Sequence, residues 1–324
     1  MIYLNDDQVS ELLHHKGLQR WTEIVERIES AFVDPTADSV PKTYLKAGNA
    51  GDYRAMPAAL GGYAALKWIG VFPNNNQVDA ILGSGIPLPT TIGTLILNDR
   101  YTGQPLMAMD CTTLTAYRTA ATSAIAAKYC APDAKEFAFI GCGLQAKYHI
   151  QAYEAICQGH MNLEVNLYDR NEKAQKKIFN WLGQENLCRA WGRSKSVKEA
   201  VERADVITTL TPSTEAYLDI LDLPNNCHIN AVGADAVGKR ELMTNVIDGA
   251  SDIICDDPIQ AIHSGELQYN EWPNLEINSL KYLINNHKTM QLDKGVSVFD
   301  STGVAIEDIA IGILVFELYY NKLK

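Results

Sequence analysis

Residues 137–146 have the sequence FAFIGCGLQA, in which an apolar run passes into the pattern Gly-x-Gly-x-x-Ala. The run predicts a short strand over 136–140, and the residues after the turn predict a helix over 145–158. Apolar strands and helices alternate from there towards the C-terminus. Such alternation predicts a parallel sheet with helices on both faces, and therefore a protein of the α/β class.

The turn itself has the features of a dinucleotide-binding site. Gly141 permits the tight turn, Gly143 lets the backbone approach a pyrophosphate, and Ala146 allows close packing of the helix on the strand. Free N–H groups at the helix N-terminus attract phosphate. We therefore expect a Rossmann domain whose cofactor is bound by these three residues together with Leu144 and Gln145.

An acidic residue follows the next predicted strand, 163–168. Asp169 stands about 20 residues after the turn, where such an acid accepts hydrogen bonds from the 2′-hydroxyl of a ribose. This position favours NAD over NADP as the cofactor. Arg170 follows directly and would tolerate a 2′-phosphate, so NADP stays an alternative.

A second segment resembles a phosphate-binding loop. Residues 233–240 have the sequence GADAVGKR, which fits GxxxxGK after a predicted strand over 228–232. A nucleotide phosphatase or kinase is therefore a competing hypothesis. Arg240 stands where Mg²⁺ binding requires Ser or Thr, and the residues after it form a poor helix. Binding of ATP–Mg²⁺ would distinguish the two hypotheses, because the dinucleotide hypothesis predicts none.

Composition narrows the class of protein and its partners. A length of 324 residues suggests two domains. The formal net charge of −11 disfavours nucleic acid and anionic membranes as partners. Seven scattered cysteines without a CxxC pair disfavour a disulfide framework or a zinc ribbon, and we expect no metal. With neither a signal peptide nor an apolar run of membrane-spanning length, we expect a cytoplasmic protein.

The first part of the chain is less regular. Residues 8–32 have helical periodicity, and the segments 43–45, 64–71 and 91–97 predict strands. An Ala-rich helix is predicted over 113–130. These elements predict a mixed region before the regular alternation begins.

Four basic residues and one acid are candidates for a ligand site. From the residues alone, Lys42 and Arg54 are better explained as a surface lysine and a loop arginine than as ligand-binding residues. Lys67 interrupts an apolar strand, where a lysine needs a compensating partner or a function. Arg118 lies on the Ala-rich helix. Asp235 follows the strand 228–232, at the edge where α/β sheets bind ligands, although such a residue is also common as a turn or cap.

The order of these motifs resembles the ornithine cyclodeaminase/mu-crystallin family, and within it the archaeal-type alanine dehydrogenases. The motifs extend over essentially the whole chain. They are Pro41-Lys42, Tyr53–Pro57, Leu66–Trp68, Leu97-Asn98 with Thr102-Gly103, Arg118–Ala121, Ile140–Ala146, His228–Asp235 with Gly238-Lys239, Ser264–Glu266, and Phe299–Gly303 with Glu307-Asp308.

The resemblance implies two domains, the first of them discontinuous. Residues 1–117 with 300–324 would form an α+β substrate-binding and dimerisation domain. Residues 118–299 would form the Rossmann NAD-binding domain. The resemblance also implies a homodimer that acts on a small amino or oxo acid.

The resemblance further assigns roles to single residues. Lys42, Lys67 and Arg118 would bind the substrate carboxylate, Asp235 would face the substrate nitrogen, and Thr90 matches a pocket threonine. Lys67, crowded by Arg54 and Arg118, would have a lowered pKa and act as a general acid or base. Arg118 would also lie close to the cofactor phosphates. The further residues expected at the cofactor are Thr119, Thr211, Ser213, Val232, Gly233 and Thr302.

Two positions, Arg54 and Asp235, distinguish between the activities known for members of this family. Ornithine cyclodeaminase carries a glutamate where this chain has Arg54, and that glutamate holds the distal amine of ornithine. An arginine would repel this ammonium group and suits a short 2-oxo or imino acid instead. Crystallin-type members lack Asp235, so its presence argues for retained amine chemistry.

The activity expected is that of an NAD(P)-dependent amino-acid dehydrogenase or imine reductase. It would interconvert a small L-amino acid and its 2-imino or 2-oxo acid. Four alternatives stay open: an ornithine cyclodeaminase-type lyase, a cyclic ketimine (pyrroline-2-carboxylate) reductase, an opine-type dehydrogenase, and a binding protein of crystallin type without catalysis.

Overall fold

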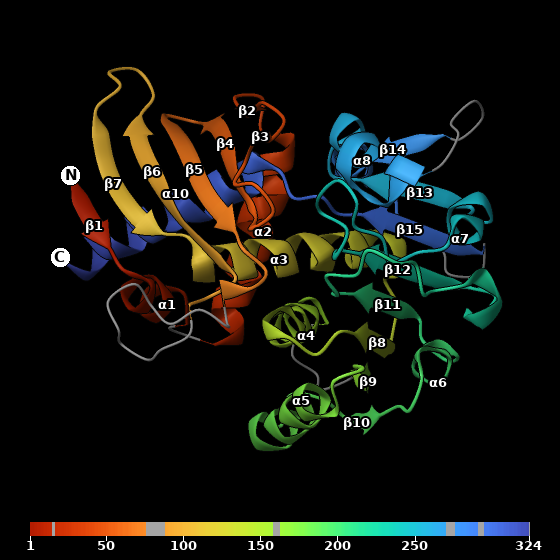
Figure 1. Cartoon of the computed structure of the whole chain (residues 1–324). Helices are drawn as coiled ribbons and strands as arrows, with labels where there is room; N and C mark the ends of the chain where they lie inside the picture. Colours follow the sequence, from red (N-terminus) through yellow and green to blue (C-terminus); the bar gives the residue numbers. More distant parts are fainter. Residues whose placement is uncertain (15–16, 76–87, 158–162, 270–275, 291–294, 324) are drawn as a thin grey trace. The chain divides into compact units, whose positions relative to one another are not determined.

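The computed structural model describes residues 1–14, 17–75, 88–157, 163–269, 276–290 and 295–323 (Figure 1). The chain separates into two compact units. The first comprises Met1–Arg20, Ser30–Arg118 and Val304–Lys324, and the second comprises Trp21–Glu29 and Thr119–Gly303. Among the described helices, none has the length and apolar character needed to cross a bilayer.

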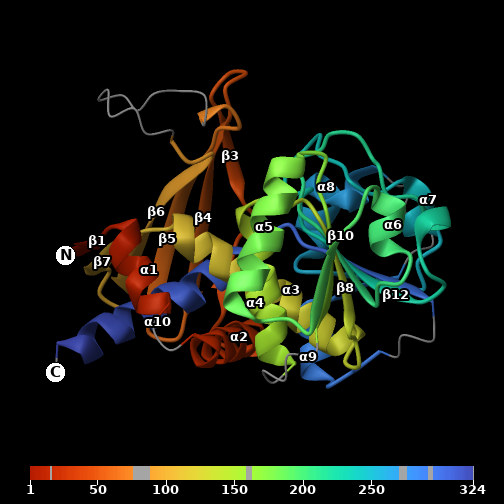
Figure 2. The same cartoon turned by 90° about the horizontal axis from the view of Figure 1, so that it is seen from below.

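The first unit is built on a mainly antiparallel sheet whose described strands follow the order β1-β7-β6-β5-β4-β2, with β3 also paired to β4. The strands are β1 (Ile2–Leu4), β2 (Asp38–Ser39), β3 (Thr43–Lys46), β4 (Asp52–Leu60), β5 (Tyr63–Val71), β6 (Thr91–Asp99) and β7 (Pro105–Asp110). Helices α1 (Asp6–His14) and α10 (Ala305–Lys322) lie on one side of this sheet (Figure 2).

Strand β4 is the main element of this unit that was not predicted from the sequence, because Pro57 stands in its middle. Proline has no N–H group for the sheet ladder. Along one edge β4 pairs with β5 over its whole length. Along the other edge β3 pairs with residues 52–55 and β2 with residues 58–59, so Pro57 falls in the gap between these two partners.

The two faces of this sheet differ in their surroundings. On the inner face, Met56, Lys67 and Leu95 are direct cross-strand neighbours and are buried. Helix α10 packs on β4, β5 and β6, and Gly312 permits the close approach, since a Cβ there would lie 2.9 Å from Leu95 Cδ2. A lysine on the inner face is therefore enclosed between strand and helix.

The second unit is a parallel sheet with the strand order β10-β9-β8-β11-β12-β15-β13-β14 in its described residues. The strands are β8 (Glu136–Ile140), β9 (Glu164–Tyr168), β10 (Ala190–Arg193), β11 (Val206–Thr209), β12 (Cys227–Ala231), β13 (Asp252–Cys255), β14 (Ile277–Ser279) and β15 (Val296–Asp300). The helices are α4 (Leu144–Ile156), α5 (Glu172–Glu185), α6 (Val197–Val201), α7 (Thr244–Asp248), α8 (Pro258–Ser264) and α9 (Leu280–Asn285), with 3-10 turns η2 (Ile220–Asp222) and η3 (Glu266–Tyr269).

The remaining helices belong to both units. Helix α3 (Thr112–Cys130) carries the chain from the first unit into the second, and α2 (Leu18–Val33) contributes its central residues to the second.

The strand order places a switch point in the second unit. From β8 the chain proceeds outwards through β9 and β10 and then returns to β11 on the other side of β8. Ligands of open α/β sheets bind at the carboxyl ends of the strands where the order reverses. The prediction of an α/β protein with a Rossmann domain is confirmed, and the switch point locates its ligand site between β8 and β11.

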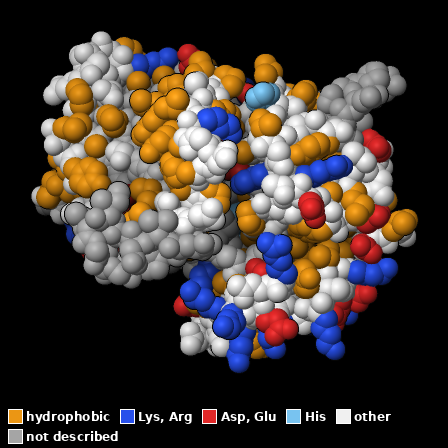
Figure 3. Space-filling model, viewed as in Figure 1, with side chains coloured by type: hydrophobic (Ala, Val, Ile, Leu, Met, Phe, Trp, Pro, Cys, Tyr) orange, Lys and Arg blue, Asp and Glu red, His pale blue; other side chains and the backbone are white. Residues whose placement is uncertain are grey.

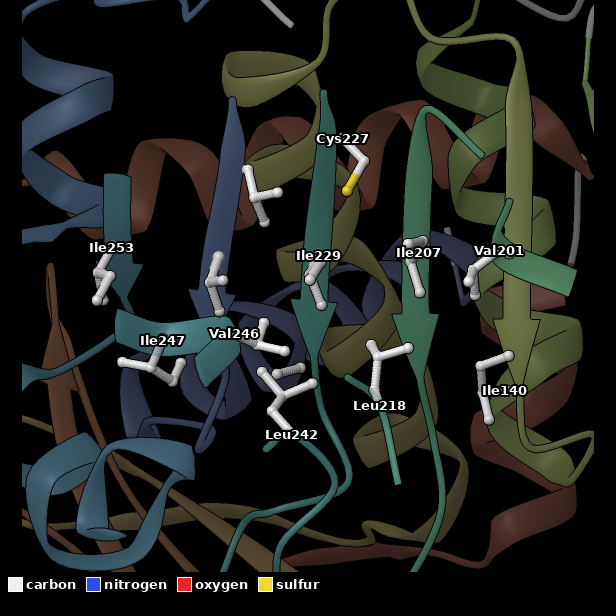
Figure 4. Close-up of a cluster of buried hydrophobic side chains, with 14 of the residues drawn as sticks. Ile140, Val201, Ile207, Leu218, Cys227, Ile229, Leu242, Val246, Ile247 and Ile253 are labelled. Atoms are coloured by element: carbon white, nitrogen blue, oxygen red, sulfur yellow. The ribbon is translucent and has the colours of Figure 1, made fainter. Parts of the chain in front are cut away.

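One face of the parallel sheet is covered by a continuous apolar cluster (Figure 4). Ile140, Ile207 and Ile229 come from neighbouring strands, and Val201 of α6 and Val246 of α7 pack against them. Branched aliphatic side chains pack well in a sheet that is buried on both faces. The cluster holds the ends of β8, β11 and β12 in place beneath the switch point.

Most predicted elements of this unit are confirmed to within two residues. The strand predicted over 136–140 agrees with β8 at both ends. The helix predicted over 145–158 ends at Ile156, and residue 158 lies outside the described residues. In the first unit, the helical pattern of 8–32 belongs to two helices instead of one, and α2 begins after Gly17, whose φ is +54°.

Candidate active site

The first unit contains a buried lysine with an acidic partner. Lys67 of β5 has a side chain that is 1% exposed, and its Nζ donates to Asp308 Oδ1 at 2.8 Å. Asp308 lies in the first turn of α10, and its side chain is also 1% exposed. The prediction that Lys67 needs a partner is thus met by an acid 241 positions away in the sequence.

A buried arginine completes the same cluster. Arg118 donates from Nη1 to Glu307 Oε2 at 2.7 Å, and its Nε lies 3.3 Å from Asp308 Oδ1. Asp308 Oδ1 therefore bridges Lys67 and Arg118. We call these four side chains, Lys67, Arg118, Glu307 and Asp308, the charge quartet. Its two formal positive and two formal negative charges balance.

The surroundings of Lys67 lower its pKa. Burial is the largest cause, since the charged form loses hydration, and Asp308 opposes this shift by attraction. Arg118 adds a further lowering by repulsion, as predicted. Asp308, Arg118 and Cys111 all act on the charge of Lys67, and the expected crowding of Lys67 by Arg54 stays a prediction.

Arg54 lies on the inner face of β4 and has an acidic partner of its own. Its side chain is 5% exposed, and Nε donates to Asp52 Oδ1 at 2.8 Å. The guanidinium carbon lies 5.5 Å from the centre of the Tyr44 ring. The explanation of Arg54 as a loop arginine is therefore wrong.

The other two predicted substrate residues lie at strand ends of the same unit. Lys42 precedes β3 and is half-buried, with Nζ 6.0 Å from the centre of the Tyr44 ring. The Tyr44 ring thus has Lys42 and Arg54 within cation–π range. Thr90 precedes β6 and is exposed, and its carbonyl accepts from the Phe72 N–H at 2.8 Å.

The second unit has a cavity of about 400 Å³ at the switch point. It is lined by the ends of β8, β9 and β11 and by the loop after β11. A volume of this size suits part of a dinucleotide. The predicted cofactor residues that line it are Gly141, Gly143, Asp169, Arg170, Thr211 and Ser213.

Asp169 anchors the glycine-rich turn from the neighbouring strand. Its Oδ2 accepts from the Cys142 N–H at 2.7 Å, and its Oδ1 accepts from the Asn171 N–H at 2.7 Å. Each carboxylate oxygen keeps a further lone pair. Asp169 therefore fixes the turn and can still accept a hydrogen bond from a ribose hydroxyl.

The two glycines of the turn have different requirements. Gly141 has φ +104°, and a Cβ there would lie 3.0 Å from the backbone of Leu210, so the protein itself demands glycine. A Cβ at Gly143 would have no protein atom within 4 Å. Gly143 is the N-cap residue of α4 and provides no side-chain hydrogen bond to the helix N-terminus. Open space beside an uncapped helix N-terminus is the cradle that a diphosphate fits.

The other predicted cofactor residues are not among the described residues that line this cavity. Ala146 is fully buried, and Leu144 is 59% exposed at the start of α4. Thr302 is buried and has protein partners, since it donates to Asp256 Oδ1 and accepts from Gln260 Nε2. The remaining members of this set are Thr119, Gln145, Val232 and Gly233.

Asp235 lies in the loop after β12, as predicted. Its Oδ1 accepts from Lys239 Nζ at 2.6 Å, and the two side chains are 32% and 24% exposed. Lys239 is the lysine of the segment that resembles a phosphate loop. That segment is not followed by a helix at residue 240, because α7 begins only at Thr244. The geometry therefore disfavours the phosphate-loop hypothesis.

Several residues that the structure places at these sites have no role predicted from the sequence. Glu307 and Asp308 had been recognised only as part of a motif. Two adjacent acids just before the apolar run 309–316 were a signal that this helix faces buried cations. Glu241 is fully buried and holds residues at the cavity wall, and Tyr217 lines the cavity itself.

The sequence profile of the ornithine cyclodeaminase/mu-crystallin family matches residues 7–322. The chain belongs to this family. The match extends over nearly the whole chain, so both units are included in it.

Individual relatives in the family agree with this assignment. The chain is 37% identical to the alanine dehydrogenase of Archaeoglobus fulgidus, over 99% of this chain and 96% of the relative. It is 33% identical to an ornithine cyclodeaminase of Agrobacterium tumefaciens, over 95% of this chain and 84% of the relative. An archaeal alanine dehydrogenase solved as a dimer with bound NAD has 34% identity and a TM-score of 0.88, covering 100% of this chain and 97% of that one.

Proposed function

We propose that this protein is an NAD-dependent amino-acid dehydrogenase and imine reductase. It interconverts a small L-amino acid and its 2-imino or 2-oxo acid. The first unit binds the substrate and the second binds the cofactor. The observation that carries this proposal is the buried pair of cations Lys67 and Arg118, both held by acids of α10, in a chain that also has a dinucleotide cradle.

The cofactor is held by residues of the second unit. Gly143 and the N-terminus of α4 bind the diphosphate, and Asp169 accepts from the ribose hydroxyl. When bound, the nicotinamide supplies or accepts the hydride that joins or leaves the substrate α-carbon.

The cations of the first unit bind and orient the substrate. Arg118 keeps its charge at all working pH values and anchors the carboxylate, with Lys42 and Arg54 as further cations of this unit. Fixing the carboxylate also fixes the α-carbon, a positional contribution of several kcal/mol. Lys67 has a lowered pKa, so it can give a proton to the carbonyl or imine group and recover it in the reverse direction.

Asp235 is the proposed acid or base at the substrate nitrogen. Its ion pair with Lys239 orients the carboxylate, and its partial exposure allows proton exchange with water. In this role Asp235 stabilises an iminium or moves a proton between the nitrogen and water.

The second candidate function is cyclodeamination of ornithine, favoured by the Agrobacterium relative. Arg54 argues against it. A buried guanidinium occupies the position where a distal ammonium would need an acid, and the adjacent Asp52 is already paired with it. We therefore rank the dehydrogenase and reductase activity first.

The assembly proposed is a homodimer formed through the outer face of the first unit's sheet. Leu66, Trp68, Ile92 and Ile96 are exposed on neighbouring strands β5 and β6. Figure 3 shows hydrophobic side chains gathered over these strands. Such a continuous apolar area is typical of protein interfaces. Replacing Trp68 by Asp should give monomers in sedimentation, whereas a wild-type protein that sediments as a monomer would refute the dimer.

The compartment proposed is the cytoplasm. All seven cysteines are free in the described structure, and all but Cys157 are buried. Free thiols agree with a reducing environment.

A substrate panel tests the proposed activity. Oxidation of NADH and of NADPH should be followed with pyruvate plus ammonium, with cyclic ketimines, and with a keto acid plus an amine. Ornithine should be tested in parallel for ammonia release. We expect net NADH oxidation with a small 2-oxo or imino acid, and Lys67→Ala should abolish it while NADH binding stays nearly intact. Ammonia release from ornithine without net oxidation of NADH would refute the proposal.

A further inference from the structure

Glu241 is a buried acid whose partners are hydrogen-bond donors. Its side chain is fully buried in the second unit. Its carboxylate accepts hydrogen bonds from the described residues Thr211, Tyr217 and Gly233, none of which carries a positive charge. A buried carboxylate without a cation is costly unless donors surround it. The position of these donors therefore indicates what Glu241 does.

The donors come from two loops that follow neighbouring strands. Oε1 accepts from the Thr211 N–H at 2.7 Å, from the Thr211 hydroxyl at 2.6 Å and from the Tyr217 hydroxyl at 2.8 Å. Oε2 accepts from the Gly233 N–H at 2.8 Å. Thr211 and Tyr217 belong to the loop after β11 and line the cavity, whereas Gly233 follows β12. One carboxylate thus joins the two loops.

Gly233 is shaped by this contact. A Cβ at this position would overlap the Glu241 carboxylate and the Thr211 carbonyl, so only glycine permits the arrangement. Gly233 is one of the residues expected at the cofactor, and its N–H group donates to Glu241. Gly233 therefore contributes to the contact by which Glu241 joins the loops after β11 and β12.

The contact also sets the polarity of Thr211. Its hydroxyl proton is given to Glu241, because the bond of 2.6 Å is shorter than the contact of 3.3 Å with the Tyr217 hydroxyl. The remaining lone pairs of Thr211 can only accept hydrogen bonds. A ligand group that meets this hydroxyl must be a donor, such as a ribose hydroxyl or a carboxamide N–H, and not a phosphate oxygen.

We propose that Glu241 is a positioning residue for cofactor binding, which acts through Thr211 by fixing its backbone and the direction of its hydroxyl. This inference rests on the proposed function, because the ligand of the cavity is the dinucleotide. The main chain would keep its fold without the carboxylate, since Tyr217 and Leu218 donate to the Glu241 carbonyl at 2.9 and 3.1 Å.

The test compares NADH affinity in matched variants. Glu241→Gln keeps the shape but turns an N–H₂ group towards one of the donors. Dissociation constants from NADH fluorescence and melting temperatures would be measured for Glu241→Gln, Thr211→Val and the double variant. The control is Tyr153→Phe, which removes another fully buried hydroxyl of this unit, bonded to Thr208 and Asn230.

We expect Glu241→Gln to weaken NADH binding by about tenfold or more, the effect of an unsatisfied buried donor. The double variant should be no more than about twofold weaker than Glu241→Gln, because both changes remove one contact. Tyr153→Phe should lower the melting temperature without changing the dissociation constant. If Glu241→Gln does not fold, Thr211→Val must still weaken binding while Thr211→Ser retains it.

If the wild-type protein binds NADH, each of three results would refute the role of Glu241 and leave the proposed function standing. These are wild-type affinity in Glu241→Gln or, where that variant does not fold, in Thr211→Val; single effects that multiply in the double variant; and an equal loss of affinity in Tyr153→Phe. Wild-type protein that binds neither NADH nor NADPH would instead refute the proposed function, and the inference with it.

Discussion

Replacing Asp308 by Asn tests the charge quartet most directly. The change keeps an oxygen that can accept from Lys67 Nζ but removes the negative charge 2.8 Å away. At an effective dielectric constant of about 20, two charges at this distance attract each other by about 6 kcal/mol. Relaxation and water entry offset part of this, and loss of one partner of a buried pair costs about 3–5 kcal/mol. We expect the free energy of unfolding to fall by this amount.

The same change should alter the pH dependence of catalysis. In the wild type, Asp308 raises the pKa of Lys67, whereas burial and Arg118 lower it. Without the Asp308 charge the largest raising cause is lost, so the pKa of Lys67 falls further and Lys67 loses its proton at a lower pH. A neutral lysine binds a carboxylate poorly. We therefore expect kcat/KM for the 2-oxo acid to fall by about tenfold or more at neutral pH, and its decline on the basic side to begin at lower pH.

The assay is the pH profile of kcat/KM for reductive amination, with Glu307→Gln as the matched control. Glu307 pairs with Arg118, whose guanidinium stays charged at every working pH. The control variant should raise KM without moving the profile. If Asp308→Asn leaves the basic limb where it is in the wild type, or if both variants move it equally, Asp308 does not control the protonation of Lys67.

Three further changes have definite expected outcomes. Arg54→Glu should lower kcat/KM for a 2-oxo acid by about 100-fold or more, because a carboxylate would meet an acid in a buried site; unchanged pyruvate kinetics would contradict the assignment of Arg54. Gly141→Ala should cost about 1–3 kcal/mol of stability, measured by urea unfolding, since φ is +104°. His149 and His228 have pKa values lowered to about 4 by burial, so the unfolded chain takes up their protons first. Stability should therefore fall between pH 6.5 and 4, by about 3 kcal/mol for each histidine, and an unfolding free energy that stays constant over this range would exclude the effect.

The second unit was largely predictable because its signals are local. A strand, a glycine turn and a helix follow each other within 136–158, and Asp169 ends the next strand. Their geometry depends on neighbours in the chain, so periodicity and turn chemistry suffice to predict it. The fold class and the nicotinamide cofactor expected from these signals are confirmed, as is the family expected from the order of motifs along the whole chain.

Strand β4 shows why the first unit was harder to predict. Pro57 argues against a central strand when only the sequence is considered. The segment nevertheless forms strand β4. Its register with β2 and β3 leaves Pro57 without a partner strand on one side, so the missing N–H group breaks no hydrogen bond there. Arg54 therefore lies on the buried face of a sheet, although the sequence predicted it in a loop.

The sequence by itself determined where the dinucleotide turn lies and that Lys67 would need a reason to be buried. Only the tertiary structure decided what that reason is. Asp308 stands 241 positions from Lys67, and Glu241 joins loops that begin at two different strands. Pairings over such separations depend on the register of strands and the packing of helices. No local pattern contains them, and they arise only when the chain closes its sheets and brings these side chains within hydrogen-bond distance.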